Sequence, residues 1–420
     1  MYQYTNDADP GTFYQAVNNG TLVYKNIKKP LAGAFNNSDK IKEIFDPAIT
    51  YLNDSCKALN LNPKDISIIL YCTAGMRKLS LDQQKSILDD SYSYIISISN
   101  YSANRNEFRV IEGYEEALFA WIGVNRWINV FNSSKTFPIF EMGGASVQIA
   151  IEQTTTDSEV APYVKTVTIA KKKYEVFCNS WLGYGYDDAA GVVHQYLNNN
   201  SITSSPCAIN GSILSLKLAD GTTKSFDGDS DYQQCYELYS NLVYKKDKNF
   251  SLHNTSLGEV PLSEDFKSST VVYVLGVPSY VASFLQLRSE ETISSLKQET
   301  LDFGLQNFST AYANDPTYSF LNASFSQQVA VMNFFERGIY PATKLLYKLP
   351  IANVEPQWTL GAVLSARSPS VNIDNTEKDS TSPWVYVGIG LATLIVIGVV
   401  AFFVYPKFSK EKSSEGAPQV

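Results

Sequence analysis

Short apolar runs alternate with segments of helical periodicity in the first part of the chain. Ile66–Cys72 is a continuous apolar run of strand length, and a polar segment typical of a helix follows at Leu81–Ser97. Apolar residues at helical spacing predict a helix over Glu115–Val130. Phe137–Ile151 predicts two strands joined by a Gly-Gly turn. This alternation predicts an α/β fold.

The second part of the chain continues the pattern less regularly. Val271–Leu275 predicts a further strand, Phe334–Leu349 a helix, and Trp358–Leu364 a final strand. Between Pro206 and Pro261 the chain turns polar, and we expect mostly loops there. A length of 420 residues implies two or more lobes, since a domain usually has about 150 residues.

A different apolar pattern stands near the C-terminus. Trp384–Tyr405 contains no charged residue and is about long enough to cross a bilayer as a helix. Three lysines follow it, so the positive-inside rule places the C-terminus in the cytosol and the body outside or in a lumen. We therefore predict a stalk at residues 366–383, a transmembrane helix at 384–405 and a cytosolic tail at 406–420.

Targeting signals at the other end do not match this topology. Eleven Asn-x-Ser/Thr triplets all precede the apolar span, as a glycosylated lumenal body requires. The first fifteen residues, however, lack the basic and apolar segments of a signal peptide. Either the span is a tail anchor and the body is cytosolic, or the sequence begins downstream of the true N-terminus.

Composition excludes several classes of protein. A hydrophobic fraction of 44% excludes wholesale disorder, and a net charge of -8 argues against a nucleic-acid binder. Two histidines almost exclude a His-based zinc centre. Five cysteines form no dense disulfide scaffold, and their odd number leaves at least one thiol unpaired.

The Gly-Gly turn carries the richest chemistry. Gly143 and Gly144 leave backbone N–H groups open to an anion. Strand alternation then places Gly144, Ser146 and Gln148 on one face, and Glu141 precedes the turn. An acid, bare backbone, a hydroxyl and an amide suit metal-assisted hydrolysis of a phosphoryl group by water. A plain hairpin with outward polar residues explains this segment equally well.

Two shorter segments are ambiguous by themselves. Glu115 and Glu116 fall in the first turn of a predicted helix, where the dipole favours any carboxylate. The same dipole would keep a catalytic base ionised. Thr73–Arg77 is a strand-to-helix turn of small residues with a following arginine, which is a weak phosphate-loop signal and more often a plain turn.

Together these segments resemble apyrase-conserved regions two to five of the ecto-nucleoside triphosphate diphosphohydrolases, the apyrase family. Further stretches that resemble the family are NSWLGYG from Asn179 and FDGDSDYQQC, which ends at Cys235. The four regions occur in the family's order as TAGMR from Thr73, EGYEEALFAWIGVN from Glu112, EMGGASVQIAI from Glu141 and WTLGAVL from Trp358.

The resemblance implies a fold and a set of partners. It implies two actin-like, RNase H-type lobes, with the nucleotide phosphates and a Ca²⁺ or Mg²⁺ ion in the cleft. Lobe I would comprise residues 1–110 without its first hairpin, completed by residues 348–365, and lobe II would comprise residues 111–347. The partners would be a nucleoside di- or triphosphate and, through the C-terminal helix, a plasma or Golgi membrane. The oligomeric state stays open.

The resemblance also implies roles for single residues. Glu116 would be the general base, Ser146 and Gln148 would hold the attacking water and the metal shell, and Glu141 would reach the metal through water. Tyr280 would stack on the base, although a core tyrosine is the alternative there. The implied phosphate contacts are Thr73, Ala74, Gly143, Gly144 and Ala145, and the implied disulfide joins Cys207 to Cys235.

Departures from the family pattern keep alternatives open. The family's first motif, a DAGSTGT-like phosphate loop, is absent before Met1, Glu141 replaces an Asp, and Val147 replaces a Thr. A sequence shortened at its N-terminus would explain both the absent loop and the absent signal peptide. We predict metal-dependent hydrolysis of nucleoside tri- or diphosphates by base-activated water. The alternatives are a non-catalytic apyrase-like membrane glycoprotein and, more weakly, an exopolyphosphatase-like hydrolase.

Overall fold

A computed structural model provides the coordinates, and it leaves a long C-terminal segment undescribed. No helix within the described part is long and apolar enough to cross a bilayer. The predicted transmembrane helix at 384–405, its tail and most of the predicted stalk lie outside the described residues. The structure describes residues 2–374 apart from 6–11, 16, 19–20, 23–26, 28, 132–134, 218–222, 245–255, 258–259, 311–320, 339–342, 348–356 and 369.

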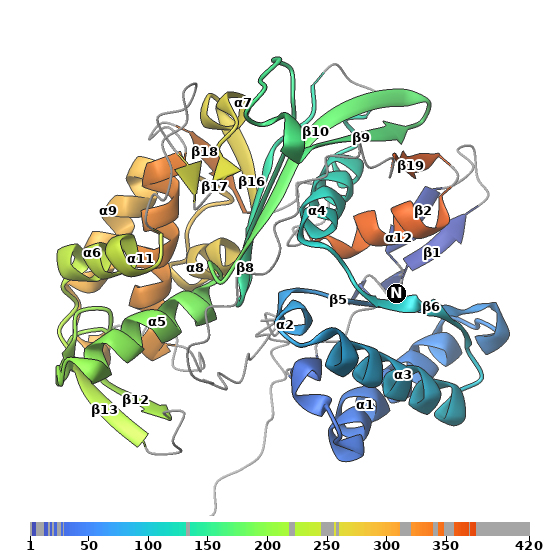
Figure 1. Ribbon diagram of the computed structural model, residues 1–420, viewed down its shortest axis with the longest axis horizontal. Coiled ribbons are helices and arrows are strands. Elements are labelled where there is room, and N and C mark those ends of the chain that lie inside the picture. The colour runs from blue at the N-terminus through green and yellow to red at the C-terminus, as the bar shows by residue number, and fades with distance from the viewer. Residues whose placement is uncertain are drawn as a thin grey trace, which may run out of the picture.

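A mixed eight-stranded sheet, here called the central sheet, runs through the middle of the molecule (Figure 1). Its strand order is β17-β18-β16-β7-β8-β10-β9-β19. Strands β7, β8 and β10 form an antiparallel meander, and β16 and β18 run parallel to β7. The bounds are β7 Ile139–Met142, β8 Ser146–Glu152, β9 Val164–Ile169, β10 Lys172–Leu182, β16 Val271–Gly276, β17 Glu290–Thr292, β18 Lys344–Leu346 and β19 Val371–Ile373.

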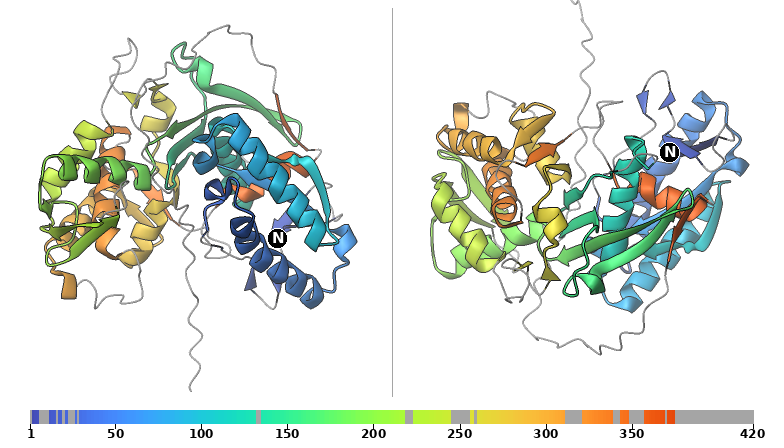
Figure 2. Two further views of the ribbon diagram at one scale, coloured as in Figure 1. Left: turned by 60° about the horizontal axis from the view of Figure 1, so that its bottom comes forward. Right: turned by 90° about the horizontal axis from the view of Figure 1, so that it is seen from above.

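Both faces of the central sheet are covered by helices, and the views in Figure 2 agree on this. Val147 and Ile149 point into a large core under α5, α6, α8, α9 and α11. Ile139 and Ala150 point to the opposite face, which packs on α4 and α12. The helices are α4 Gly113–Trp127, α5 Tyr186–Asn199, α6 Tyr232–Leu242, α7 Glu264–Lys267, α8 Val277–Phe284, α9 Ile293–Gly304, α11 Leu321–Gly338 and α12 Thr359–Arg367.

A smaller group of elements, here called the N-terminal unit, has its own core. Two helices, α1 and α3, pack with a parallel pair of strands, β5 and β6, around Ile41, Ile87 and Phe108. Helix α3 begins with a capping box between Ser80 and Gln83. The elements are η1 Leu31–Ala34, α1 Ser38–Ala58, η2 Pro63–Asp65, β5 Ser67–Cys72, α2 Ala74–Arg77, α3 Leu81–Ile98 and β6 Ser102–Val110.

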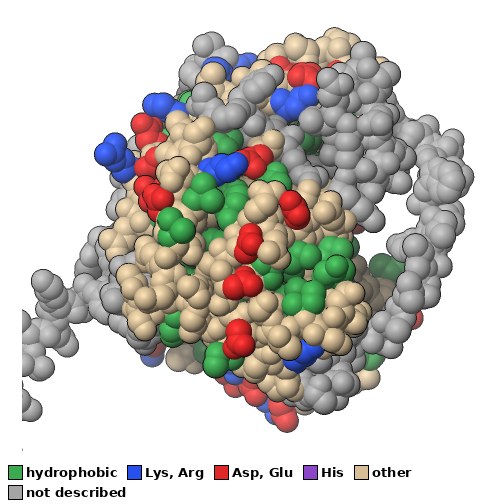
Figure 3. All heavy atoms as spheres, turned by 90° about the vertical axis from the view of Figure 1, so that its left-hand side faces the viewer, with side chains coloured by type: hydrophobic (Ala, Val, Ile, Leu, Met, Phe, Trp, Pro, Cys, Tyr) green, Lys and Arg blue, Asp and Glu red, His purple; other side chains and the backbone are tan. Residues whose placement is uncertain are grey.

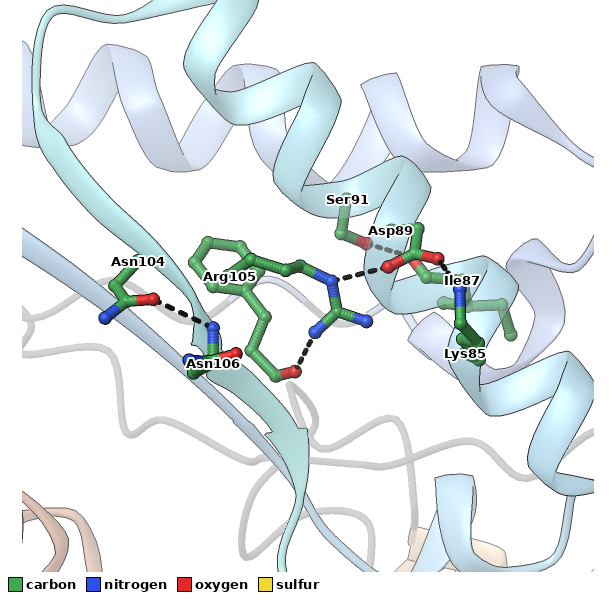
Figure 4. Close-up of polar contacts among 8 residues, drawn as sticks. Lys85, Ile87, Asp89, Ser91, Asn104, Arg105 and Asn106 are labelled. Atoms are coloured by element: carbon green, nitrogen blue, oxygen red, sulfur yellow. Dashed lines mark hydrogen bonds and ion pairs between the residues drawn. The ribbon is translucent and has the colours of Figure 1, made fainter.

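Strand β6 leaves its regular pairing with β5 between Ala103 and Phe108. Arg105 holds this excursion in place (Figure 4): its Nε donates to Asp89 at 2.5 Å and its Nη1 to the carbonyl of Phe108 at 2.6 Å. Lys85 donates to the second oxygen of Asp89 at 2.6 Å. The hydrogen bond between Arg105 and Asp89 therefore attaches the irregular part of β6 to α3.

The left-hand side of Figure 1, where α6, α9 and α11 lie, carries charged side chains of both signs, and the coloured part of this face shows no continuous basic patch (Figure 3).

The remaining strands are short and peripheral. The short elements are β1 Tyr2–Thr5, β2 Thr12–Gln15, β3 Val17–Asn18, β4 Thr21–Leu22, η3 Ala161–Tyr163, β11 Ser204–Ser205, β12 Ile213–Lys217, β13 Thr223–Gly228, β14 Ser256–Leu257 and β15 Val260–Pro261.

Four predictions from the pattern were wrong. Trp358–Leu364 is not a strand, because Thr359 begins helix α12. The helix predicted over Phe334–Leu349 ends at Gly338, and strand β18 follows. The polar region from Pro206 to Pro261 contains a small sheet and helix α6. The range predicted as a stalk begins inside the fold, because Val371–Ile373 pairs with β9.

Helices α4 and α12 touch through their backbones. A Cβ atom at Gly361 would lie 1.9 Å from the carbonyl oxygen of Phe119, and one at Gly123 would lie 2.9 Å from the carbonyl oxygen of Gln357. Only glycine fits at such a distance. This contact lets α12 cover α4, whose residues Leu118 and Trp121 are fully buried.

We expect Gly361→Ala to lower the free energy of unfolding by about 2–4 kcal/mol, because the two helices must separate to admit the new methyl group. Gly191→Ala is the control, since a Cβ at this helical position meets no atom within 4 Å and alanine favours a helix by up to about 1 kcal/mol. Urea unfolding measures both. Equal midpoints for the two variants would contradict the close contact.

Candidate functional site

Four segments that are distant in sequence meet where the N-terminal unit approaches the central sheet. They are the turn from β5 into α2, the first turn of α4, the β7–β8 hairpin and the first turn of α5. Helix α2 lies between the two bodies in Figure 1. Lys78, just after α2, forms an ion pair with Asp188 of α5. This junction is the candidate site.

The first residues of α5 pack against the Gly-Gly turn and form a hydrogen bond with it. The Gly143 N–H donates to the Ser146 carbonyl at 2.9 Å, and the Tyr186 N–H donates to the Gly143 carbonyl at 2.9 Å. A Cβ atom at Gly185 would lie only 2.3 Å from the Ser146 nitrogen. The absence of a side chain at Gly185 therefore lets α5 begin directly against the turn and fix its shape.

Ser146 and Gln148 share one face of β8, as the alternation predicts. Gln148 Nε2 donates to Ser146 Oγ at 2.7 Å, and both residues are buried. Glu141 of β7 lies directly opposite Gln148 in the strand pairing, so the two side chains leave the sheet on the same side. Gln148 Oε1 is buried and has no hydrogen-bond partner. An acceptor atom is therefore available at this point.

Glu116 is the buried carboxylate of the junction, with an exposed fraction of 5%. Burial raises the pKa of its carboxyl group above the ordinary value, and the Arg77 guanidinium opposes this effect. Its neighbour Glu115 instead stabilises the local structure. Glu115 accepts two hydrogen bonds from Arg109, at 2.7 and 2.8 Å, and one from the Glu112 N–H at 2.8 Å. The structure thus separates two carboxylates that the helical pattern left equivalent and that only the family resemblance distinguished.

Arg77 is the member of the site to which the sequence assigned no role. Its Nη2 forms an ion pair with Glu116 and lies 3.5 Å from Ser146 Oγ. Its Nη1 donates to Ser180 Oγ of β10 at 3.3 Å. Arg77 lies in the TAGMR stretch that resembles the family. This motif could have drawn attention to Arg77, but it could not show its partners, which lie far away along the chain.

The other predicted residues occupy positions around this junction. Thr73 precedes the first residue of α2, and Ala74 is buried at its start. Tyr280 lies in α8, which begins after Gly276 at the end of the sheet where β7 leads into the turn. The roles of these residues stay predictions.

The cysteines are divided between one bridge and three thiols. Cys207 and Cys235 form a disulfide with an S–S distance of 2.06 Å, as the resemblance implied, and it ties α6 to the segment after β11. Cys56, Cys72 and Cys178 are buried free thiols.

The donors at the junction fit a hard divalent cation that keeps much of its water. No group of three or more His, Cys, Asp or Glu side chains that could hold a metal occurs within the described part of the chain. Oxygen atoms are nevertheless concentrated here, and Gln148 Oε1 is a buried oxygen with no hydrogen-bond partner. A cation bound through few protein oxygens, water and phosphate, as Mg²⁺ prefers, suits such a set.

Asp187 adds a second acid at the start of α5. Its Oδ2 is buried without a hydrogen-bond partner. Burial, together with the charge of Asp188, raises its pKa to about 6 from an ordinary value of 3.8. The folded protein therefore holds this proton more tightly than the unfolded chain does. The stability that the proton contributes is present below about pH 4 and is lost as the pH rises through about 6.

We expect Asp187→Asn to stabilise the protein at pH 8, because asparagine cannot acquire the buried charge. The gain should be about 1–3 kcal/mol at pH 8 and should shrink towards zero at pH 4. Urea unfolding without nucleotide at both pH values measures it. The exposed Asp90 provides the control variant Asp90→Asn, which should show no such trend. The same gain at pH 4 and pH 8 would contradict the assignment.

Comparison with known proteins gives one consistent result. The model of the GDA1/CD39 (nucleoside phosphatase) family matches residues 60–378. The Golgi apyrase of Schizosaccharomyces pombe is 33% identical over 45% of this chain and 36% of that protein. The nucleoside-triphosphatase ntp-1 of Caenorhabditis elegans is 22% identical over 86% of this chain and 73% of that protein. A crystal structure of a nucleoside triphosphate hydrolase from Neospora caninum has a similar fold, with a TM-score of 0.55 and 13% identity over 78% of each chain.

Proposed function

The chain belongs to the GDA1/CD39 (nucleoside phosphatase) family, and we propose that it releases phosphate from nucleoside tri- and diphosphates. The family prediction from the sequence is thereby confirmed. Relatives named Golgi apyrase and nucleoside-triphosphatase support this activity. The observation that carries the mechanism is the burial of Glu116, Ser146 and Gln148 together beside the Gly143–Gly144 turn.

In the proposed mechanism, water attacks the terminal phosphoryl group in line with the leaving oxygen. Ser146 Oγ and the Gln148 amide hold this water, and Glu116 accepts its proton. The raised pKa of Glu116 suits this role, because a base works best when its pKa approaches the working pH. The backbone of Gly143–Ala145 and the Thr73–Ala74 segment bind the phosphate oxygens from the two sides of the junction.

The cofactor of the proposed reaction is Ca²⁺ or Mg²⁺. The family supports a divalent cation in general, and the oxygen donors beside Gln148 Oε1 fit one. Glu141 and Gln148 would hold it through water. When bound, the cation neutralises charge on the phosphate oxygens. We further propose that Tyr280 stacks on the nucleobase.

We also propose the finer organisation that the resemblance implied. The strands β10-β8-β7-β16-β18 combine an antiparallel meander with two parallel strands, which is the order of an RNase H-like lobe. Residues 111–347 would form lobe II, and residues 1–110 with 348–365 would form lobe I. The body would be lumenal or extracellular and anchored by residues 384–405, in the Golgi or the plasma membrane. The name of the yeast relative, a Golgi apyrase, supports this location.

We expect Glu116→Gln to reduce phosphate release from ATP, ADP, UDP and GDP by about 10²–10⁴-fold, because the amide cannot accept the proton of water. Glu112→Gln is the matched control, since this carboxylate lies on the same helix start but is exposed. Circular dichroism checks that both variants fold. Full activity in a folded Glu116→Gln protein would refute the base assignment.

We expect removal of divalent cations by a chelator to abolish phosphate release and readdition of Ca²⁺ or Mg²⁺ to restore it, because the phosphate charge is then neutralised again. Titration of the two ions against rate identifies the preferred one. The thermal unfolding midpoint without nucleotide should stay unchanged, since few protein oxygens would hold the ion. Turnover that continues after complete chelation would contradict a metal-dependent reaction.

A further inference from the structure

The guanidinium of Arg77 covers the residues that are proposed to activate water. It forms an ion pair with Glu116 and lies 3.5 Å from Ser146 Oγ. The exposed fractions of the two side chains in the ion pair are 13% for Arg77 and 7% for Glu116. Arg77 belongs to α2 of the N-terminal unit, whereas Glu116 and Ser146 belong to α4 and β8. A cation of the N-terminal unit thus forms an ion pair with the proposed base, which lies on α4.

The fold provides a specific slot for this guanidinium. A Cβ atom at Gly113 would lie 2.4 Å from Arg77 Nη1 and 2.5 Å from the Cβ of Ser180. Any other residue at position 113 would displace the guanidinium. Ser180 Oγ accepts a hydrogen bond from Nη1 at 3.3 Å. Contacts with three elements, α4, β8 and β10, therefore hold the guanidinium of Arg77 in place.

The ion pair competes with catalysis for the carboxylate of Glu116. A general base must lie within hydrogen-bond reach of the water whose proton it accepts, and here the Nη2 atom of Arg77 pairs with one of the two carboxylate oxygens of Glu116, Oε2. The Nε atom of Arg77 is buried without a hydrogen-bond partner, so the guanidinium retains an unused donor. Guanidinium groups pair with carboxylates and with phosphates by the same forked geometry. A phosphate is therefore a direct competitor of Glu116 for Arg77.

We propose that Arg77 exchanges partners when nucleotide binds: it pairs with Glu116 in the empty site and moves to the terminal phosphate of the substrate. The exchange frees the base only when there is a phosphoryl group to attack. This inference rests on the proposed function. It assigns Arg77 to substrate binding and makes the Arg77–Glu116 pair a contact that holds the empty enzyme inactive.

A thermodynamic cycle tests the exchange without using turnover. Binding of the non-hydrolysable analogue adenylyl imidodiphosphate with Mg²⁺ is measured by calorimetry for wild type, Glu116→Gln, Arg77→Gln and the double variant. Glu116→Gln should bind about 10- to 100-fold more tightly than wild type, because Arg77 no longer has to leave a carboxylate. Arg77→Gln should bind the analogue more weakly than wild type. The double variant should bind it no more tightly than Arg77→Gln alone.

A control and a conservative variant complete the design. Lys78→Gln removes the other ion pair beside α2, with Asp188, and the gain from Glu116→Gln should persist in it. If Arg77→Gln does not fold, Arg77→Lys replaces it, because lysine keeps the charge but loses the fork. The increase in affinity that Glu116→Gln causes should then be at least several-fold smaller in the Arg77→Lys protein than in wild type.

The outcomes separate the two proposals. An equal gain from Glu116→Gln with and without Arg77 would mean simple relief of repulsion and would overturn the exchange. Wild-type affinity in Arg77→Gln would overturn it as well. Failure of the proposed function gives a different result, because a wild-type protein that does not bind the analogue refutes both proposals at once.

Discussion

The buried carboxylate of Glu116 is the constraint on which the junction depends. A carboxylate withdrawn from water costs several kcal/mol unless a cation or hydrogen bonds compensate it. Arg77 supplies the cation, and to do so it must reach from the N-terminal unit into the central sheet. The glycine at position 113 and the small Ser180 then follow, because the guanidinium needs room between them. The ion pair of this buried charge, together with that of Lys78 and Asp188, joins the N-terminal unit to the elements of the central sheet.

Features with a local cause were predictable from the sequence. The apolar run before Thr73 became β5, and the Gly-Gly turn joins β7 to β8. The common face of Ser146 and Gln148 followed from the strand period of two. The motifs added the family, which the family model confirms over residues 60–378. The assignments of single residues to catalysis stay predictions, since their chemistry depends on a bound substrate.

Features with a tertiary cause were missed. Trp358–Leu364 was predicted as a strand because a short apolar run cannot distinguish a strand from a buried helix. In the structure Thr359 begins a helix that packs mainly on α4. Arg77 meets Ser180 across 103 positions of sequence. The raised pKa of Asp187 arises from burial at the start of α5. No local pattern encodes such proximity.

The backbone contact between α4 and α12 has a consequence for biosynthesis. Helix α4 carries Glu116, yet the helix that covers its apolar face comes near the end of the described chain. During translation the ribosome therefore releases α4 long before α12, and its face must wait uncovered or be shielded by a chaperone. The edge strand β19 arrives later still. The helix that carries the proposed base is thus covered only after α12 has emerged, so a chain interrupted before α12 would lack this cover.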